Sequence, residues 1–489
     1  MNITQIFKNI EVISYTGKED IVIDRLSQDT REEYSSQTLY FAVSGTQVDG
    51  HDYIAQAIEK GATGVVCDHL PQNINENILY ILVAKVSECI GYIAANFYRN
   101  PTDILKVIGV TGTNGKTTVA TNIYQALLRL DKKAALFSTA GDFINDQPFD
   151  AYRLAGTSME IIEFNKNART AVDAGCEYLC IEATSHALDQ GRLNGVTIHG
   201  TVFTNLTQDH LNYHGTMQHY AAAKKKLFDR LDKSHFAIVN ADDVYGSLMV
   251  SETKAKVITY GNAEVLDVND RDLVFKVQGF SLKGAELSIN AESFHVQCLG
   301  TFNMYNITAS YGVLRELGFS AQAITKALSG IKGARGRMEI VSGKNKPQVI
   351  GIVDYAHTPD ALQNVLETLQ ELAHNKIITV VGVGGDRDRT KRSLMARIAQ
   401  DNSDYVIFTS DNPRMENPQQ IFSDLLAGCD SSKENFEKVQ DREVAIKKAT
   451  QRAEAGDIIL VAGKGHEDYQ IIGTLKNHFD DVEVLSNFL

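Results

Sequence analysis

GVTGTNGKTT, at residues 109–118, separates two regular patterns of opposite kind. It follows the apolar run ILKVIGV, residues 104–110, which is typical of a buried parallel strand. It precedes residues 116–130, where apolar side chains recur at helical spacing. The segment between them is too rich in glycine for regular structure, so the order predicts strand, loop and helix at the start of an α/β domain.

The residues of this loop suit phosphate binding. Gly112 and Gly115 let backbone N–H groups turn toward phosphate oxygens, Lys116 supplies a mobile positive charge, and Thr117 supplies a hydroxyl for Mg²⁺. Val110 stands where strict GxxxxGK[ST] has its first glycine. A plain tight turn would not need Lys-Thr at the start of a helix, so we expect an ATP site.

The size and charge of the chain narrow its class. At roughly 150 residues per domain, the 489 residues predict about three domains. Lys and Arg number 48 against 61 Asp and Glu, a formal net charge of −13 that repels nucleic acid. No stretch has the roughly 18 apolar residues of a spanning helix, and the first residues do not resemble a signal peptide. We therefore expect a cytoplasmic protein without membrane insertion.

Composition shifts divide the chain into three segments. Asn100-Pro101 and the Gly/Arg-rich GARGR, residues 333–337, are candidate boundaries. We expect domains at residues 1–101, 102–333 and 334–489, the second and third with strands and helices in alternation. Residues 255–299 read as hairpins that cover one side of the second domain. The fold class is α/β, with a central P-loop-type parallel sheet and a C-terminal Rossmann-like domain.

Polar residues follow two further strands of the second segment. Glu182 ends the apolar run EYLCIEA, where a carboxylate can bind Mg²⁺. Asp209, His210 and His214 crowd the loop after GTVFTN. A zinc site is an alternative there, but the set lacks the usual structural ligands. Lys224, within three consecutive lysines, would ordinarily lie on a solvated helix face.

Four loops of the third segment each follow an apolar strand: DYAHTPD (354–360), GVGGDRDRTKR (382–392), SDNPRMENP (410–418) and GKGHEDYQ (463–470). Because parallel strands end at the same edge, these loops should meet. They carry both signs of charge: Arg387, Arg389, Lys391, Arg392, Arg414 and Lys464 with Asp386, Asp411 and Glu467. Such a cluster suits an amino acid, whose carboxylate binds Arg and whose ammonium binds Glu or Asp.

The ordered set of motifs resembles the Mur ligases of peptidoglycan synthesis. It comprises TGTNGKTT, EATSHAL, TNLTQDHLNYHG, YAAAK, FNMYN, GRMEI, DYAHTPD, GGDRDRTKR, DNPR and GKGHEDYQ. The resemblance extends from about residue 25 to the C-terminus. It implies an ATP-dependent ligase that phosphorylates the D-glutamyl side carboxylate of UDP-MurNAc-L-Ala-D-Glu and joins an amino acid to it. It also implies a monomer.

The resemblance assigns roles to residues of the nucleotide site. Lys116, Glu182, His210 and Lys224 would be catalytic, and Thr117, Glu182, His210 and Lys224 would hold Mg²⁺. Lys224 matches a carbamylated lysine of the family, a modification that requires a neutral amine and hence a lowered pKa. The implied ATP-binding residues are Gly112, Thr113, Asn114, Gly115, Lys116, Thr117, Thr118, Asn303, Asn306, Arg337 and Asp354.

The resemblance also assigns the other two substrates. For UDP-MurNAc-L-Ala-D-Glu the implied residues are Thr30, Gln47, His51, Asn114, Thr157, Ser158, Ser185, Gln190 and Arg192. For the amino acid they are Arg387, Asp411, Asn412, Arg414, Gly463 and Glu467. DNPR resembles the motif of the family members that add meso-diaminopimelate. An arginine suits that substrate, because Arg414 can form two hydrogen bonds to a distal carboxylate that lysine lacks.

Three alternatives stay open. An L-lysine-adding ligase would leave the Arg414 charge uncompensated in its pocket. A folylpolyglutamate-type ligase would not need DNPR or a uridine-type N-terminal domain. A nucleotide-gated regulatory protein would keep the phosphate loop, but would not need Lys224 or the charged loops of the third segment.

Overall fold

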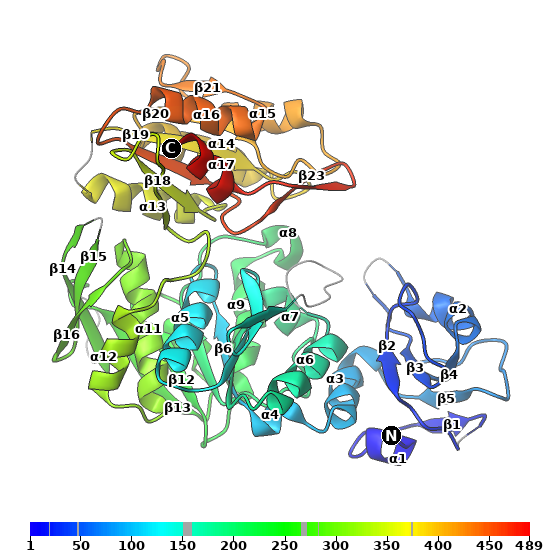
Figure 1. The fold of residues 1–489 in the computed structure, drawn as a ribbon. Helices are drawn as coiled ribbons and strands as arrows, with labels where there is room; N and C mark the ends of the chain where they lie inside the picture. Colours follow the sequence, from blue (N-terminus) through cyan, green and yellow to red (C-terminus); the bar gives the residue numbers. More distant parts are fainter. Residues whose placement is uncertain (19, 46–47, 150–158, 266–270, 282, 373–374) are drawn as a thin grey trace.

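The computed structural model describes residues 1–489 except 19, 46–47, 150–158, 266–270, 282 and 373–374. Its described part has three α/β bodies in chain order, each built on one sheet (Figure 1). This confirms the expected fold class, and the boundaries at 101 and 333 remain predictions. Among the described helices, none is long and apolar enough to cross a membrane.

The first body has a five-stranded sheet of order β1-β5-β4-β3-β2. Only β1 is antiparallel to its neighbour. A 3-10 turn leads directly into a short α-helix between β3 and β4. The strands are β1 (Ser14–Thr16), β2 (Arg25–Ser27), β3 (Thr38–Phe41), β4 (Ala62–Cys67) and β5 (Leu79–Leu82), and the helices are α1 (Ile3–Ile6), η1 (Gly50–Tyr53), α2 (Ile54–Glu59) and α3 (Val86–Phe97).

The second body has an eleven-stranded sheet of order β16-β15-β14-β13-β12-β11-β6-β10-β7-β8-β9. Its strands are β6 (Lys106–Thr111), β7 (Ala134–Ser138), β8 (Gly141–Ile144), β9 (Gln147–Phe149), β10 (Tyr178–Glu182), β11 (Gly200–Phe203), β12 (Phe236–Asn240), β13 (Lys256–Asn262), β14 (Leu273–Ser281), β15 (Gly284–Ile289) and β16 (Glu292–Val296). Its helices are α4 (Pro101–Ile104), α5 (Lys116–Arg129), α6 (Ile161–Asp173), α7 (Ser185–Asp189), α8 (Leu211–His214), α9 (Met217–Asp229), α10 (Gly246–Met249), α11 (Thr301–Glu316) and α12 (Ala321–Ser329).

The expectation that residues 255–299 form hairpins over one side was wrong in part. β13 and β14 continue the parallel sheet beyond β12, and only β14, β15 and β16 are joined as antiparallel hairpins. They extend the edge of the sheet and do not cover a face. Without β13, the outer edge of β12 would leave backbone N–H and C=O groups unpaired; β13 pairs with them.

The third body has a six-stranded sheet of order β17-β18-β22-β19-β20-β21 and a separate hairpin. Within the six-stranded sheet, all strand pairs are parallel except β17 with β18. The hairpin is antiparallel. The strands are β17 (Glu339–Val341), β18 (Ile350–Asp354), β19 (Ile377–Val383), β20 (Tyr405–Ser410), β21 (Phe436–Lys438) and β22 (Ile458–Ala462), and the hairpin is β23 (Tyr469–Ile472) with β24 (Leu475–His478). The helices are α13 (Pro359–Glu371), α14 (Thr390–Asp401), α15 (Pro418–Leu426), α16 (Arg442–Arg452) and α17 (Asp481–Phe488).

Local sequence explains where these helices begin. Thr358 and Asn417 each precede a proline and accept a hydrogen bond from a backbone N–H of the first helical turn. The side-chain oxygen satisfies a donor that the helix leaves free, and proline at the first position loses nothing because its N–H would have no partner. Helices α13 and α15 therefore begin at Pro359 and Pro418.

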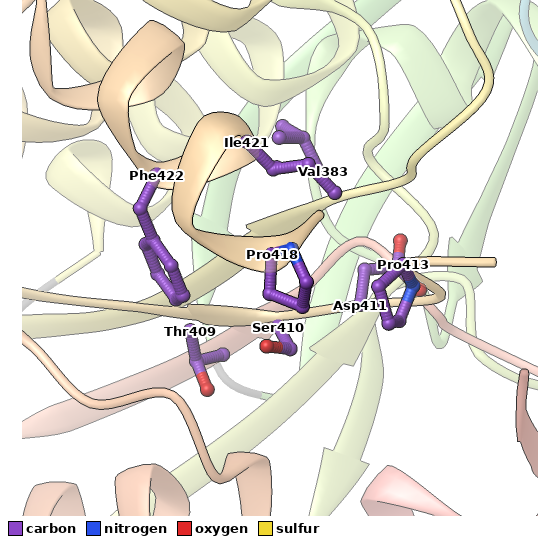
Figure 2. A pocket seen from close by; sticks show the side chains of 8 residues that line it. All are labelled: Val383, Thr409, Ser410, Asp411, Pro413, Pro418, Ile421 and Phe422. Atoms are coloured by element: carbon purple, nitrogen blue, oxygen red, sulfur yellow. The ribbon is translucent and has the colours of Figure 1, made fainter. Parts of the chain in front are cut away.

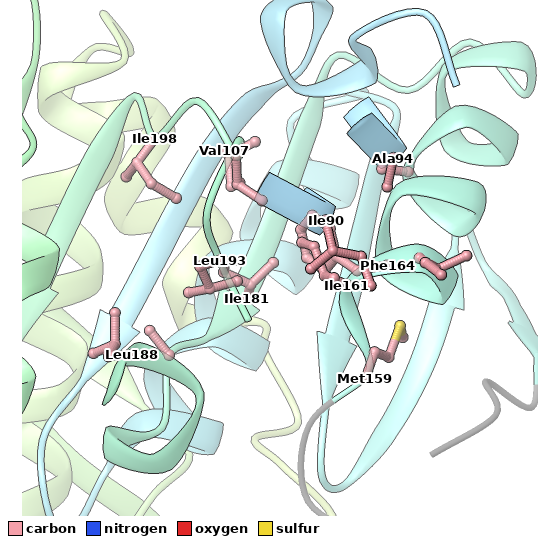
Figure 3. Close-up of a cluster of buried hydrophobic side chains, with 14 of the residues drawn as sticks. Ile90, Ala94, Val107, Met159, Ile161, Phe164, Ile181, Leu188, Leu193 and Ile198 are labelled. Atoms are coloured by element: carbon pink, nitrogen blue, oxygen red, sulfur yellow. The ribbon is translucent and has the colours of Figure 1, made fainter. Parts of the chain in front are cut away.

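Helix α3 joins the first body to the second. Its buried residues Ile90 and Ala94 share one apolar cluster with Val107 of β6 and with Ile161 and Phe164 of α6 (Figure 3). A Cβ atom on Gly91 would lie 2.0 Å from the backbone oxygen of Asn194. Only glycine allows this approach, so α3 is fixed against the second body.

A fully buried ion pair holds the last helix onto the third sheet. Arg442, at the start of α16, donates from Nε and Nη2 to the two carboxylate oxygens of Asp481, each at 2.7 Å. Both side chains are 0% exposed. Arg442 Nη2 also donates to the backbone oxygen of Ala462 at 3.0 Å, which ties the pair to the end of β22.

Arg442→Met should destabilise the third body strongly. The substitution leaves the Asp481 carboxylate buried without its partner, which typically costs about 3–5 kcal/mol. Urea unfolding measures the free energy of unfolding directly. Lys433→Met, which breaks the exposed pair with Asp401, is the control and should change little. Equal stability of both variants would show that the buried pair contributes nothing.

Candidate active site

The site begins at strand β6, which lies between β10 and β11 and is parallel to both. In this register Val110 is opposite Glu182, and Thr111 is opposite Phe203. The loops that leave these three strands therefore start at the same edge of the sheet. They are the phosphate loop at residues 112–115, the segment after Glu182 and the segment 204–210.

Two glycines of the phosphate loop have no substitute. Gly112 has φ +153° and Gly115 has φ +87°, both in a region that residues with a Cβ avoid. A Cβ on Gly112 would lie 1.9 Å from Thr204 Oγ1, and one on Gly115 would lie 2.4 Å from Asn306 Oδ1. Asn306 in turn donates to Asn303 Oδ1 at 3.2 Å, so both predicted asparagines lie beside the loop.

Two lysines from different helices meet at the carbonyl group of Gly112. Lys116 Nζ donates to it at 3.1 Å and to the Thr113 carbonyl at 2.7 Å. Lys224 Nζ, on α9, donates to the Gly112 carbonyl at 2.6 Å. Burial and the proximity of the two amines lower the pKa of Lys224 well below its ordinary value. Burial likewise lowers the pKa of Lys116, against the raising effect of Glu182.

Hydroxyl and carboxylate oxygens form a hydrogen-bonded series beside the phosphate loop. Glu182 Oε1 accepts hydrogen bonds from the Thr139 N–H at 2.8 Å and from the Thr139 hydroxyl at 3.1 Å. Thr139 Oγ1 lies 3.4 Å from Thr117 Oγ1. Thr113 Oγ1 donates to the Thr207 carbonyl at 3.1 Å, and Thr118 follows in the first turn of α5. These oxygens are the ligand type that Mg²⁺ prefers.

His210 lies on the segment 204–210, which leaves β11 at this sheet edge. Its backbone is left-handed, with φ +53°. Burial lowers its pKa, while the Asp209 carboxylate, 3.3 Å away, opposes that shift. His214 Nε2 is hydrogen-bonded to Ser185 Oγ at 2.9 Å. Asp209, His210 and His214 do not form a group of metal-binding size among the described residues, which argues against the zinc alternative.

The third body reaches the phosphate loop directly. Arg337 donates to Thr117 Oγ1 at 3.2 Å, and Asn114 Nδ2 donates to Asp360 Oδ2 at 2.8 Å. The Arg337 guanidinium lies 4.4 Å from the ring centre of Tyr355. Asp354 is buried and accepts from the backbone N–H groups of Met338 and Ala356, each at 2.7 Å. Burial raises the pKa of Asp354, and Arg337 lowers it.

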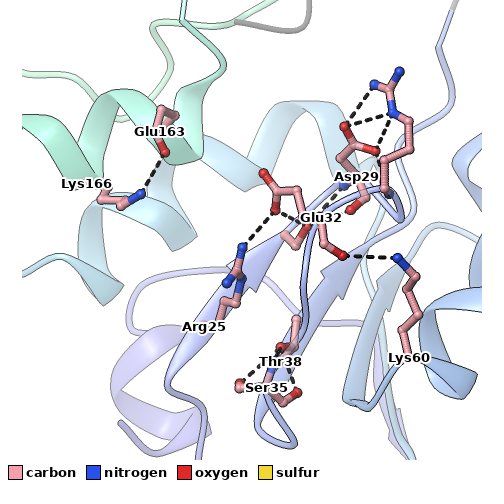
Figure 4. A network of polar contacts seen from close by, with 10 residues as sticks. Arg25, Asp29, Glu32, Ser35, Thr38, Lys60, Glu163 and Lys166 are labelled. Atoms are coloured by element: carbon pink, nitrogen blue, oxygen red, sulfur yellow. Dashed lines mark hydrogen bonds and ion pairs between the residues drawn. The ribbon is translucent and has the colours of Figure 1, made fainter. Parts of the chain in front are cut away.

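In the first body, Thr30 and His51 are held by neighbouring side chains. Thr30 donates to Gln56 Oε1 at 2.9 Å. The segment around it is braced by Glu32, which accepts from Ser27 at 2.8 Å and from Arg25 at 3.4 Å (Figure 4).

The His51 ring is fixed at both nitrogens. Nδ1 is 2.7 Å from Asp49 Oδ1 and Nε2 is 3.1 Å from Asp68 Oδ1. In the described chain, His51, Asp68 and His69 are the one His/Cys/Asp/Glu group close enough to share a metal ion. Nothing in the sequence spacing had indicated it.

Of the remaining predicted residues of the UDP-MurNAc-dipeptide site, Arg192 contacts Glu160. Arg192 forms an ion pair with Glu160 at 3.3 Å, and Gln28 of the first body donates to the same carboxylate at 3.1 Å. Gln190 donates to the Tyr213 hydroxyl at 3.3 Å. Gln47, Thr157 and Ser158 lie outside the described residues.

The charged loops of the third body meet, as the parallel strands predict. Asn412 Nδ2 donates to Glu467 Oε2 at 2.7 Å, and Lys464 Nζ donates to the same oxygen at 3.2 Å. Asp411 is buried beside them, and Gly463 has φ +114° with Asp411 Oδ2 next to it. Arg387 is exposed, with Nη1 donating to the backbone oxygen of Asp386 at 3.2 Å.

Arg414 has a left-handed backbone with φ +53° that two flanking contacts hold in place. Its N–H donates to the Ile471 carbonyl at 3.1 Å, and its own carbonyl accepts from the Gly473 N–H at 2.8 Å. The side chain donates from Nη1 to the Gly385 carbonyl at 2.9 Å. A hairpin far along the chain therefore stabilises a backbone conformation that a side chain disfavours.

A small, partly open pocket lies beside the DNPR turn (Figure 2). Its lining is mostly apolar: Val383, Thr409, Ser410, Asp411, Pro413, Pro418, Ile421 and Phe422. Asp411 is the one charged member of this lining, and it belongs both to the pocket and to the charged loops.

Two residues of this arrangement were not among the predicted site residues. Thr139 is the partner of Glu182, and Asp360 is the partner of Asn114. Each follows an apolar strand at the same sheet edge as the predicted residues. The position of Thr139 at the end of AALFST was a usable signal.

Comparisons with known proteins agree with the motifs. The family descriptions "Mur ligase family, catalytic domain", "Mur ligase middle domain" and "Mur ligase, glutamate ligase domain" match residues 33–98, 110–314 and 336–465. A solved MurF ligase from Thermotoga maritima in complex with ADP shares the fold at 17% identity, with a TM-score of 0.61 over 96% of this chain and 98% of that chain.

More similar proteins carry one name, UDP-N-acetylmuramoyl-L-alanyl-D-glutamate--2,6-diaminopimelate ligase. The relative from Phocaeicola vulgatus is 44% identical and the one from Bacteroides fragilis 42%, over 99% of this chain and 99% and 98% of theirs. A solved structure of that name is 32% identical, with a TM-score of 0.70 over 100% of this chain and 98% of the other. The resemblance in the motifs is confirmed, and the chain belongs to the Mur ligase family.

Proposed function

We propose that this protein uses ATP to join meso-diaminopimelate to the D-glutamyl side carboxylate of UDP-MurNAc-L-Ala-D-Glu, in peptidoglycan precursor synthesis. The observation that carries the proposal is the contact of the third body with the phosphate loop, through Arg337 on Thr117 and Asp360 on Asn114. It brings the body with the charged loops to the place where a phosphate would lie. The names of the full-length relatives describe the same reaction.

The reaction has two chemical steps. A carboxylate oxygen of the D-glutamyl group attacks the γ-phosphorus of ATP, which gives an acyl phosphate and ADP. The neutral amine of the amino acid then attacks the acyl carbon, loses a proton, and the tetrahedral intermediate expels phosphate to leave the amide. Both partners of the first step are anions, so positioning and charge neutralisation supply most of the acceleration.

Residues of this chain supply the neutralisation. Lys116 and the backbone N–H groups from Gly112 to Thr118 surround the phosphates, and Arg337 adds a cation from the third body. Asn303 and Asn306, packed beside Gly115, form part of the nucleotide site. Asp354 positions the Arg337 segment through its bond to the Met338 N–H.

Mg²⁺ fits the donor atoms near the loop. Thr117 and Glu182 present hard oxygen ligands and are connected through Thr139. Together with His210, whose lowered pKa keeps a neutral ring, and Lys224 as a carbamate, they would hold the ion. Bound Mg²⁺ neutralises phosphate charge as the phosphoryl group moves.

Lys224 has the properties that carbamylation requires. Its side chain is 1% exposed, and no described carboxylate forms an ion pair with it. The lowered pKa favours the neutral amine, whose nitrogen attacks CO₂ and then releases one proton. The product replaces a buried neutral amine with an anion that has two oxygen ligands.

The UDP-MurNAc-dipeptide is bound between the first and second bodies in this proposal. Glu160 connects them, because it pairs with Arg192 of the second body and accepts from Gln28 of the first. The proposed contacts are Thr30, Gln47, His51, Asn114, Thr157, Ser158, Ser185, Gln190 and Arg192. The ion pair with Glu160 also keeps the Arg192 guanidinium partly buried.

The amino acid is bound at the charged loops of the third body, by Arg387, Asp411, Asn412, Arg414, Gly463 and Glu467. Asp411 and Glu467 suit an ammonium group, and the two arginines suit carboxylates. Arg414 favours diaminopimelate over L-lysine, because lysine has no second carboxylate to pair with it. The lysine-adding alternative is therefore the less favoured reaction at this pocket.

Phosphate release tests the whole proposal. With Mg-ATP and UDP-MurNAc-L-Ala-D-Glu, we expect release only when meso-diaminopimelate is added, and little with L-lysine or with no amino acid. A preference for L-lysine would keep the ligase and overturn the pocket assignment. Release that does not depend on an amino acid would contradict the ligation step itself.

Arg414→Ala should weaken use of diaminopimelate far more than use of ATP. Loss of a charge-assisted contact is worth about 1.5–3 kcal/mol, or roughly 10- to 100-fold in KM for the amino acid. Steady-state kinetics with each substrate varied in turn measures the difference. Arg397→Ala, at an exposed arginine of α14, is the matched control. An equal loss for ATP and for diaminopimelate would place Arg414 outside the amino-acid pocket.

Lys224→Ala should reduce kcat by about 10²–10³, the usual cost of removing a preorganised charge from an active site. A short-chain carboxylic acid should restore part of the activity by replacing the carbamate oxygens. Lys225→Ala, next in the sequence and paired with Asp229 and Glu252, should retain kcat. Near-normal turnover of Lys224→Ala would remove the carbamate from the mechanism.

A further inference from the structure

Lys464 is a buried lysine between two buried or partly buried acids. Its side chain is 0% exposed. The amine donates to Glu467 Oε2 at 3.2 Å and to the backbone oxygen of Tyr469, and it lies 3.8 Å from Asp411 Oδ1. The side chains of Asp411 and Glu467 are 10% and 14% exposed. Water can therefore do little to stabilise any of the three charges.

The two acids are unequally satisfied by hydrogen bonds. Glu467 Oε2 accepts from both Lys464 and Asn412. Asp411 Oδ1 is buried and has no hydrogen-bond partner among the described residues. Burial and the neighbouring Asp411 charge raise the pKa of Glu467, and Lys464 opposes the shift. Two carboxylates with one ammonium leave a net charge of −1, which matches one incoming ammonium group.

Other elements around this trio also carry charged or titratable groups. Arg442 of α16 is already neutralised by Asp481. Asp411 or Glu467 also interacts electrostatically with Tyr355 after β18, Arg387 and Lys391 after β19, and Tyr469 at β23. Arg414 after β20 and Asp468 before β23 act on Tyr469. Of these cations, Arg387 and Arg414 are the proposed carboxylate ligands, and Lys391 acts on Asp411 through its charge. Lys464 is the cation that is hydrogen-bonded to Glu467.

We propose that Lys464 is a positioning residue that keeps Asp411 and Glu467 ionised together, so that the pair can bind the ammonium group of the incoming amino acid. Without a cation between them, two adjacent buried carboxylates share a proton. A protonated Glu467 neither attracts an ammonium group nor accepts from it as strongly. This inference rests on the proposed amino-acid site.

The test is the pH dependence of KM for diaminopimelate in Lys464→Met relative to the unsubstituted protein. Removing the lysine, which lowers the pKa of Glu467, should raise that pKa further. A larger fraction of Glu467 is then protonated at a given pH, and this fraction falls as the pH rises. The ratio of the two KM values should be highest at low pH and fall by up to about tenfold per pH unit until Glu467 is ionised. Taking the ratio cancels the titration of the substrate amine.

Three further variants separate charge from packing. Lys464→Arg keeps a cation and should show a ratio that does not change with pH. Lys464→Met combined with Asp411→Asn removes one acid with the lysine, so the pH dependence should disappear although affinity stays low. Because that double variant removes the repulsion, it also provides a measurement if the single variant does not fold. Lys433→Met, at an exposed lysine of the same body, should behave as the unsubstituted protein.

KM for ATP should stay unchanged in every variant. A ratio for Lys464→Met that is the same at all pH values would overturn the proposal, as would a loss confined to kcat. A pH-dependent ratio that persists in the double variant would also overturn it. Failure of the proposed function is distinguishable, because it would appear as absence of diaminopimelate-dependent phosphate release in the unsubstituted protein.

Discussion

The parallel pairing of β6 with β10 and β11 is the constraint on which the site depends. It places the phosphate loop, Glu182 and the segment with His210 at one sheet edge, where contacts such as that of Thr113 with Thr207 then join them. A one-residue shift of β10 would turn Glu182 to the other face of the sheet and away from Thr139. The apolar residues of these strands, buried on both faces, fix that register and so determine the chemistry at the edge.

Cations gather at this edge in a chain whose net charge is −13. Lys116 and Lys224 donate to the same carbonyl group, and Arg337 approaches from another body. The surrounding negative charge does not weaken binding of an anionic substrate, because burial makes the nearest charges dominate. Nearby charges dominate in the third body as well. This is why it can hold both carboxylate-binding arginines and an acidic pair.

Local patterns were enough to predict most elements, whereas contacts between distant segments were not predictable. Residues 116–130 were expected as a helix because the spacing of apolar residues is a local signal, and the structure has a helix at Lys116–Arg129. The parallel addition of β13 and β14 depends on an open sheet edge, which residues 255–299 do not reveal. The contact of Asn114 with Asp360 joins residues 246 positions apart, and no spacing within either motif indicates it.

Helix α3 belongs to the first family match in the sequence but packs against the second body of the structure. The matched range 33–98 ends with α3, yet Ile90 and Ala94 complete the apolar cluster beneath β6 and α6. Exchanging this segment with that of a relative would therefore also require a matching surface on α6 and a backbone that can approach Gly91. Recombination within the family is accordingly constrained by packing at this helix and not by the loop that follows it. The first two bodies are expected to evolve as one unit, while the third is free to acquire a different amino-acid pocket.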